Sequence, residues 1–195
     1  MIMSKNPEFI VYTGPMMSGK TSKLLMKVER FKFQKQHVFA FKPKIDDRYS
    51  TTEITTHMGW KLPATCVANG EELLKELSVK INANDRNDNI VVAVDELFMI
   101  PGVSEPLIWL FKIGVTVVVS TLELSWNCQP FAEVSKILPF ATVVDKCFAV
   151  CTVCQRDAYY SWRRTEDKDE ILVGGSELYE ARCYKHHPVM NNGEK

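Results

Sequence analysis

The sequence predicts an α/β fold in which a parallel β-sheet is flanked by helices. Apolar runs at residues 90–94 and 115–119 consist of Val, Ile, Ala and Thr, which is typical of strands buried on both faces. Helical patterns alternate with such runs before residue 145, and this alternation favours a parallel sheet with crossover helices. A chain of 195 residues is long enough for one such domain and a small additional unit.

Local patterns predict the remaining elements of this domain. We expect two more strands at residues 8–12 and 38–41, and helices at residues 20–36, 70–79, 106–112 and 131–138. Residues 44–57 and 82–89 are polar and are expected to form loops. The basic residues Lys42 and Lys44 are expected to face solvent rather than a phosphate group.

The charge balance does not indicate a nucleic-acid or membrane partner. Lys and Arg number 24, as do Asp and Glu, so the formal net charge is zero. A nucleic-acid-binding domain is usually basic, and no run of this sequence reaches the length of a membrane span. The first residues also lack the apolar centre of a signal peptide. We therefore expect a cytoplasmic protein that binds neither nucleic acid nor a membrane.

Residues 14–21 read Gly-Pro-Met-Met-Ser-Gly-Lys-Thr and match the phosphate-binding pattern G-x-x-x-x-G-K-[ST], the P-loop. The segment lies between a predicted strand and a predicted helix, which is the context that the motif needs; a chance match in a turn is the alternative. Backbone N–H groups of such a loop surround a phosphate at the positive end of the helix dipole. A nucleoside triphosphate is therefore expected, and the sheet should be of the P-loop NTPase type. The expected phosphate-binding residues are Gly14, Pro15, Met17, Ser18, Gly19, Lys20 and Thr21.

An acidic pair, Asp95 and Glu96, follows the apolar run at residues 90–94. In P-loop enzymes an acidic residue at this place holds Mg²⁺, to which the hydroxyl of Thr21 would also bind. The neighbouring Glu96 could act as a general base on a substrate hydroxyl. A solvated strand end is the alternative, and the P-loop makes the functional interpretation the stronger one.

Four residues near the C-terminus have the spacing of a zinc site. Cys151 and Cys154 form a C-x-x-C pair, and Cys183 and His186 form a C-x-x-H pair. Two such pairs predict a closed tetrahedral site for structural Zn²⁺. His187 is an alternative fourth ligand, although the spacing favours His186. A redox C-x-x-C motif would be expected to open a helix in a βαβ unit, which is not the pattern here.

The sequence changes in character near residue 145. Short β-like pieces at residues 148–150, 158–163 and 170–173 replace the alternation of strands and helices. We therefore predict a nucleotide-binding α/β domain at residues 1–145. Residues 146–195 are predicted to form a small zinc-binding β subdomain with a long loop.

With these motifs in this order, the chain resembles the zinc-containing (type II) thymidine kinases of the human cytosolic, bacterial and poxvirus type. The resemblance covers roughly residues 9–186 and rests on several specific motifs. The P-loop is similar to the family's G-P-M-F-S-G-K-[ST]. Further matches are residues 46–50 with D-x-R-Y, 95–96 with the start of D-E-[AG]-Q-F, 129–131 with x-P-F, 149–154 with A-V-C-x-x-C, and 173–179 with the thymidine-binding lasso.

This resemblance implies an enzyme that phosphorylates thymidine with ATP to give thymidine 5′-monophosphate, acting as a homotetramer. It implies that Glu96 is the general base, that Asp46 assists at the sugar and Mg²⁺, and that Arg48 stabilises the transferred phosphoryl group. Lys20 and Mg²⁺, held by Thr21 and Asp95, would neutralise phosphate charge. The residues implied to enclose the nucleoside are Met16, Leu122, Trp126, Phe131 and Tyr179, with the backbone of Leu172, Val173 and Gly174.

The chain departs from the family pattern at the nucleoside pocket. Leu97, Phe98 and Met99 replace the small residue, Gln and Phe that follow D-E, and Trp126 stands where Phe would flank the base. Three alternatives therefore stay open at this point. They are a deoxynucleoside kinase with altered base specificity, a catalytically inactive nucleotide-binding regulator, and a zinc-ribbon nucleic-acid module fused to an ATPase.

Overall fold

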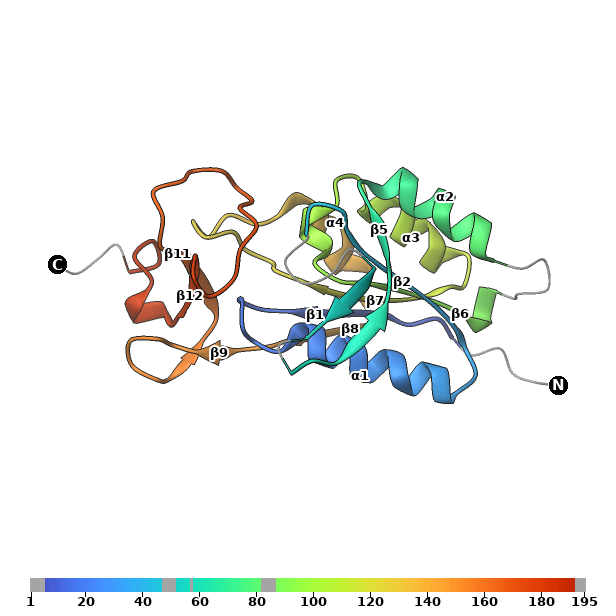
Figure 1. Ribbon diagram of the computed structural model, residues 1–195, viewed down its shortest axis with the longest axis horizontal. Helices are drawn as coiled ribbons and strands as arrows, with labels where there is room; N and C mark the ends of the chain where they lie inside the picture. Colours follow the sequence, from blue (N-terminus) through green and yellow to red (C-terminus); the bar gives the residue numbers. More distant parts are fainter. Residues whose placement is uncertain (1–5, 47–51, 57, 82–86, 192–195) are drawn as a thin grey trace.

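A parallel six-stranded sheet forms the centre of the protein, as the sequence predicts (Figure 1). The computed structural model describes residues 6–46, 52–56, 58–81 and 87–191. The strands lie in the order β5-β2-β6-β7-β1-β8, and every neighbouring pair is parallel. Their bounds are β1 (Phe9–Thr13), β2 (His37–Pro43), β5 (Thr65–Val67), β6 (Ile90–Val94), β7 (Thr116–Thr121) and β8 (Val143–Lys146).

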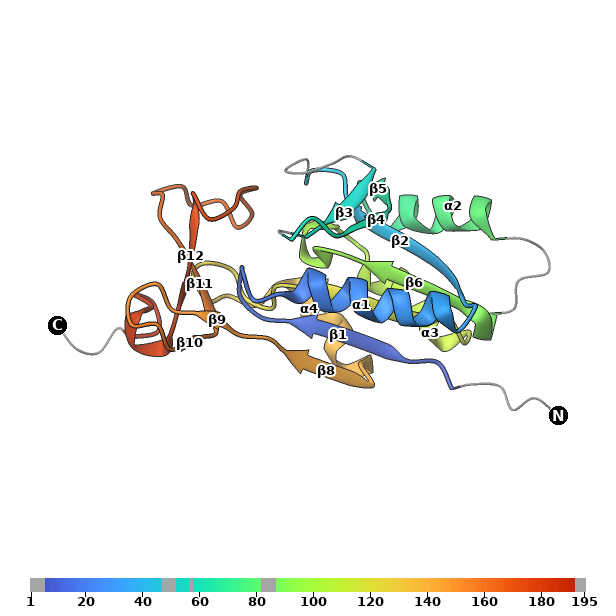
Figure 2. The same cartoon turned by 60° about the horizontal axis from the view of Figure 1, so that its bottom comes forward.

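Helices cover both faces of this sheet (Figure 2). On one face lies α1 (Lys20–Phe33), together with the hairpin of β3 (Glu53–Thr55) and β4 (Lys61–Pro63). The other face is covered by α2 (Gly70–Lys80), α3 (Ser104–Lys112) and α4 (Ala132–Ile137). Short 3₁₀ turns complete the chain: η1 (Asn87–Asn89), η2 (Leu97–Met99), η3 (Leu138–Phe140) and η4 (Tyr184–His186).

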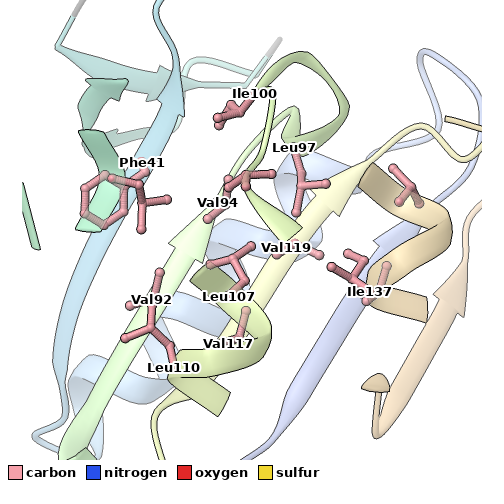
Figure 3. Close-up of a cluster of buried hydrophobic side chains, with 14 of the residues drawn as sticks. Phe41, Val92, Val94, Leu97, Ile100, Leu107, Leu110, Val117, Val119 and Ile137 are labelled. Carbon is pink, nitrogen blue, oxygen red and sulfur yellow. The ribbon is translucent and has the colours of Figure 1, made fainter. Parts of the chain in front are cut away.

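The alternation of side chains along the central strands explains their continuous apolar sequence. Val92 and Val94 of β6 point towards α3 (Figure 3), whereas Val91 and Ala93 pack with α1 on the opposite face. Every residue of β6 and β7 is buried. Burial of apolar surface on both sides therefore fixes the two strands at the centre of the sheet.

The edges of the sheet differ from the prediction. Strands β5 and β8 were not predicted, and neither was the hairpin of β3 and β4, of which only β3 lies within residues 44–57, the segment expected to be a polar loop. Each of these strands has only three or four residues, and Val143 and Val144 of β8 are about half exposed. Short edge strands do not need an apolar run, so their pattern resembles that of a loop. Helix α1 also ends at Phe33, earlier than the predicted residue 36.

The chain after β8 forms a small β unit with a core of its own. Strand β9 (Ala149–Val150) pairs with β10 (Asp157–Ala158), and β11 (Tyr160–Arg163) pairs with β12 (Tyr179–Arg182), both antiparallel. Their small core consists of Ala149, Cys151, Ala158 and Ala181. The expected strand at residues 170–173 was wrong, because these residues lie in the long loop between β11 and β12. Strand β12 was not predicted.

None of the helices in the described part of the chain has the length and apolar character that a membrane crossing needs.

Candidate functional site

The loop after β1 has the backbone geometry of a tight turn around an anion. Gly14, Met17 and Gly19 all have positive φ angles, of 136°, 63° and 78°. The Nζ of Lys20 donates to the carbonyl of Pro15 at 2.6 Å, which folds the loop back on itself. Helix α1 then begins without a side-chain cap. The first N–H groups of a helix have no partner within it, so this turn is suited to an anion.

Lys20 is buried beneath this loop, and burial lowers the pKa of its ammonium group. The carboxylates of Glu96 and Asp95 oppose this effect by favouring the charged form. A phosphate group in the loop would act in the same direction as these carboxylates.

Asp95 lies directly behind the loop, at the end of β6. The hydroxyl of Thr21 is 3.2 and 3.3 Å from its two carboxylate oxygens, and the hydroxyl of Ser120 donates to Oδ1. Burial, and then the charge of Glu96, raise the pKa of Asp95 to about 7. Thr21 and Asp95 thus place hard oxygen donors side by side, which is the donor set that Mg²⁺ prefers.

Glu96 has a left-handed backbone, with φ 48° and ψ 45°, where the chain leaves β6 and enters η2. A positive φ is unusual for a residue other than Gly, Asn or Asp, and such strain is often found at functional sites. The turn buries Leu97 completely and directs the Glu96 side chain towards the carboxyl ends of the strands.

Two cavities meet at Glu96. The first has a volume of about 310 Å³ and contains the P-loop residues Met16 to Thr21, together with Asp95 and Glu96. Lys42 and Asp46, from β2 and the turn after it, line the same cavity, with Nζ and Oδ2 3.9 Å apart. The expectation that Lys42 faces solvent was therefore wrong, because the end of β2 turns its side chain inwards. Arg48, expected near this cavity, lies outside the described residues.

The second cavity is narrow, at about 20 Å³, and it shares Met16 and Glu96 with the first. Of the eight residues expected at the nucleoside, only Val173 is missing from its lining. Those present are Met16, Leu122, Trp126, Phe131, Leu172, Gly174 and Tyr179. Phe98 and Met99, which depart from the family pattern, also line this cavity, and the rings of Phe98 and Phe131 lie 4.6 Å apart.

The predicted zinc ligands come together in the C-terminal unit. The ligand atoms of Cys151, Cys154, Cys183 and His186 all lie within 4.8 Å of one another. The Sγ atoms of Cys154 and Cys183 are 3.7 Å apart, and Nδ1 of His186 is 3.3 Å from Sγ of Cys183. A tetrahedral Zn²⁺ with Zn–S bonds of about 2.3 Å requires ligand atoms roughly 3.4–3.8 Å apart. The cluster fits zinc.

Electrostatics at this cluster favour a metal-binding thiolate. Burial of the Cys151 thiol opposes ionisation, but backbone N–H groups of Cys183, Cys154 and Val153 and the ring of His186 outweigh it. Together they lower the pKa of Cys151 to about 6. A thiol with such a pKa is largely ionised at neutral pH, and the thiolate is the form that binds a metal.

His187, the alternative ligand, lies outside this cluster. Its ring is fully buried between Tyr160 and Trp162, and its Nε2 is 3.2 Å from the carbonyl of Ser161. The favoured choice of His186 from the C-x-x-H spacing agrees with this arrangement.

Comparison with known proteins identifies the family of this chain. A family model described as thymidine kinase matches residues 8–187. The chain is 38% identical over 186 residues to the thymidine kinase of Thermococcus kodakarensis, covering 92% of this chain and 93% of that protein. It is 36% identical over 178 residues to the thymidine kinase of Mesoplasma florum, covering 88% and 86%. The chain belongs to the thymidine kinase family. The family resemblance stated from the sequence motifs is therefore confirmed.

Several residues at the two cavities of this thymidine kinase family member were not recognised from the sequence, and three of them have notable contacts or burial. Ser120 bonds to Asp95, Lys42 lines the first cavity, and Arg163 of β11 is fully buried beside the second. The position of Ser120 near the end of the apolar strand β7 could have indicated that its hydroxyl belongs to the site. Lys42 and Arg163 lack a local signal, because their roles depend on segments that are distant in the sequence.

Proposed function

We propose that this protein transfers the γ-phosphoryl group of ATP to the 5′-hydroxyl of thymidine, giving thymidine 5′-monophosphate and ADP. The position of Glu96 carries the proposal, since its side chain lines both the cavity at the P-loop and the narrow cavity beside it. A general base must reach the attacking hydroxyl while the phosphoryl group lies on the other side. Membership of the thymidine kinase family and the names of the two relatives support the choice of substrate.

The first cavity is proposed to bind the triphosphate of ATP. The loop carries the backbone N–H groups that surround phosphates, and Lys20 supplies a positive charge to the β- and γ-phosphates. Mg²⁺ bound with ATP would neutralise phosphate charge, and Thr21 and Asp95 would hold it. The proposed phosphate-binding residues are Gly14, Pro15, Met17, Ser18, Gly19, Lys20, Thr21 and Asp95.

The second cavity is proposed to bind the nucleoside once its walls move apart, because a cavity of about 20 Å³ is too small to hold a nucleoside. The residues proposed to enclose the nucleoside are Met16, Leu122, Trp126, Phe131, Leu172, Val173, Gly174 and Tyr179. Glu96 then accepts the proton of the 5′-hydroxyl as its oxygen forms a bond to the γ-phosphorus. The bond between that phosphorus and the β–γ bridging oxygen breaks, and ADP leaves with the electron pair. Asp46 assists at the sugar, and Arg48 stabilises the phosphoryl group. Alignment and charge neutralisation supply most of the catalysis in such a reaction.

Zinc is proposed to have a structural role in residues 146–195, with the nucleotide-binding domain at residues 1–145. The cluster joins the turn after β9 to the turn after β12, so that it fixes both ends of the segment that contains β11, β12 and the long loop. Holding these ends together reduces the entropy that the chain loses when the loop becomes ordered. We place the protein in the cytoplasm, where cysteines more often bind metals than form disulfides.

A homotetramer is proposed from the family resemblance, and one exposed surface supports an interface. Phe33 and Met26 of α1 have 86% and 60% of their surface exposed, and Trp60 is also exposed. These residues line a groove of about 710 Å³ between α1 and the start of β4. Large exposed apolar patches commonly mark protein interfaces. Light scattering after size exclusion would measure the mass, and a monomer at micromolar concentration would contradict this part of the proposal.

The test of the function is a phosphorylation assay with ATP and Mg²⁺. Thymidine, deoxyuridine, deoxycytidine and the purine deoxynucleosides are compared under the same conditions, and product is identified by mass spectrometry. We expect thymidine 5′-monophosphate as the main product. No product from thymidine, with the zinc site filled and the protein folded, would reject the proposal. Faster turnover of another nucleoside would reject thymidine as the preferred substrate and make Phe98 and Met99 the first residues to test.

A further inference from the structure

We propose that Arg163 is a positioning residue that holds residues 167–172 as one wall of the nucleoside cavity, and that Trp126 provides a second tie to the same segment. The nature of the ligand rests on the function proposed above, whereas the tie itself is a property of the folded chain. Glu170, Ile171 and Leu172 line the second cavity. These residues belong to a long loop that has no regular secondary structure.

All three nitrogens of the Arg163 guanidinium donate hydrogen bonds, and two of them reach the loop directly. Nη1 donates to the carbonyls of Asp167 and Asp169, at 3.2 and 2.5 Å. Nη2 donates to the carbonyl of Glu170 at 3.3 Å, and both Nη2 and Nε donate to the hydroxyl of Tyr179, at 2.9 and 3.2 Å. One side chain therefore gathers three backbone carbonyls that would otherwise face solvent.

Tyr179 extends this network to the wall of the cavity. Its hydroxyl receives hydrogen bonds from Arg163 and donates its own proton to the carbonyl of Leu172, at 2.7 Å. Leu172 and Tyr179 both line the second cavity. Loss of the guanidinium would leave Tyr179 without the donors that orient its hydroxyl, so the position of Leu172 depends on Arg163 through one intermediate group.

Trp126 provides a second tie to the same segment. Its indole Nε1 donates to the carbonyl of Asp169 at 3.2 Å, and its ring faces the Arg163 guanidinium, with 5.4 Å from Cζ to the ring centroid. The aromatic ring of Tyr179 lies at 5.3 Å from the same guanidinium. A phenylalanine at position 126, as in the family pattern, would keep the ring and lose the N–H donor. Tryptophan in place of the family's phenylalanine thus adds one hydrogen bond to the loop.

The burial of Arg163 shows that the arrangement is built around its charge. Its exposed fraction is 1%, which makes it one of the largest fully buried side chains among the described residues. The carboxylate of Asp167 is 3.4 Å from Nη1 and is itself partly exposed, so carbonyl dipoles and two aromatic faces supply the remaining stabilisation. Lysine cannot make the same set of hydrogen bonds as the guanidinium, because its ammonium group is a compact point charge with fewer donors. A buried arginine without a role in ordering the loop would be costly to keep.

The experiment compares Arg163→Met, Arg163→Lys and Trp126→Phe with the wild-type protein. The matched control is Arg164→Met, which removes the neighbouring arginine of the same hairpin, exposed in 49% of its side chain and paired with Glu180 at 2.5 Å. The first measurement is the KM for thymidine and for ATP. The second is the rate of trypsin cleavage after the exposed Lys168 under native conditions, followed by mass spectrometry. Zinc content per chain serves as the measure of correct folding.

For both Arg163 variants we expect a rise of about tenfold or more in the thymidine KM, with the ATP KM within about twofold of wild type. Cleavage after Lys168 should be faster by a similar factor, because proteolysis follows local opening of the loop. Trp126→Phe should shift cleavage in the same direction by a smaller factor, and Arg164→Met should change neither measurement. An Arg163→Met variant that loses zinc is replaced in the comparison by the other two variants.

Unchanged thymidine KM and unchanged cleavage in Arg163→Lys and Trp126→Phe would overturn the proposal. An equal rise in both KM values with no change in cleavage would also overturn it, because the loop would then be held as in the wild type and the defect would not be confined to the thymidine site. A wild-type protein without activity on thymidine would reject the proposed function alone. In that case the cleavage rates would still decide whether Arg163 and Trp126 hold the loop.

Discussion

Substitution of Gly14 by alanine tests whether the shape of the P-loop depends on its contact with the chain after β8. Gly14 has a φ of 136°, which L-residues with a Cβ rarely adopt. A Cβ at this position would lie 3.0 Å from the carbonyl carbon and 3.3 Å from the Cβ of Cys147, and closer still to the carbonyl oxygen. Cys147 cannot easily move away, because its N–H donates to the carbonyl of Thr13 at 2.7 Å.

The expected magnitude follows from these distances. Non-bonded carbon atoms prefer a separation of about 3.5–4.0 Å, so the loop must shift by roughly 0.5–1 Å to accept the methyl group. The disfavoured backbone adds about 1–3 kcal/mol, and crowding in a packed region adds a similar amount. A displacement of about 1 Å in a catalytic loop commonly lowers the rate by about 100-fold. We therefore expect kcat/KM for ATP to fall by about that factor.

The assay measures kcat/KM for ATP and the midpoint of thermal unfolding in parallel. Gly102→Ala is the matched control, because Gly102 also has a positive φ, of 66°, but its added Cβ would meet no atom within 4 Å. The control should lose about 1–2 kcal/mol of stability from strain alone and keep its activity. Activity of Gly14→Ala within about twofold of wild type would refute the reasoning, since it would show that the loop accepts the methyl group without moving.

Three further predictions concern the carboxylates and the metal. Glu96→Gln should retain binding of thymidine and ATP, measured by calorimetry, while kcat falls by about 10²–10⁴-fold; near-normal turnover would remove Glu96 from the mechanism. Metal analysis should find one zinc per chain. A strong chelator should lower the midpoint of thermal unfolding and raise the KM for thymidine. An unchanged midpoint and an unchanged KM after chelation would contradict a structural role for zinc. Because the pKa of Asp95 is raised to about 7, folding favours its protonated form, and stability is lost as pH rises from about 4 through 7. Without Mg²⁺, the Asp95→Asn variant should therefore be more stable than the wild type at pH 8, by up to about 4 kcal/mol, and the difference should shrink at pH 5. Equal stability of the two proteins at both pH values would contradict the buried carboxylate. The variant should also lose phosphorylation activity.

The central strands and the first helix were predictable because their signals are local. Burial on both faces requires a continuous apolar run, and residues 90–94 and 115–119 show that run directly. Strand β8 has no such requirement, because it is an edge strand whose outer side faces solvent. The expected strand at residues 170–173 fails for a related reason. The carbonyls of Glu170 and Leu172 accept hydrogen bonds from the side chains of Arg163 and Tyr179 instead of from a neighbouring strand.

The same distinction separates the parts of the site. The P-loop and the two metal-ligand pairs have fixed short spacing, so their chemistry was recognisable from residues close together in the chain. The clustering of all four metal ligands agrees with that prediction. The roles of Lys42 and Arg163 depend on packing between segments that the sequence does not relate. The roles assigned to individual residues at the two cavities stay predictions that the experiments above address.

Hydrogen bonds join the C-terminal β unit to the P-loop and the chain after β8 to the end of β1. The N–H of Met16, within the P-loop, donates to the hydroxyl of Ser161 on β11 at 2.9 Å. The N–H of Cys147 donates to Thr13, the last residue before that loop. Strand β11 also carries Arg163 two residues further on, which holds the wall of the second cavity. A displacement of β11 would therefore move the P-loop and the nucleoside cavity together. This shared strand would give a zinc ion, bound at the proposed site, a physical route to both cavities.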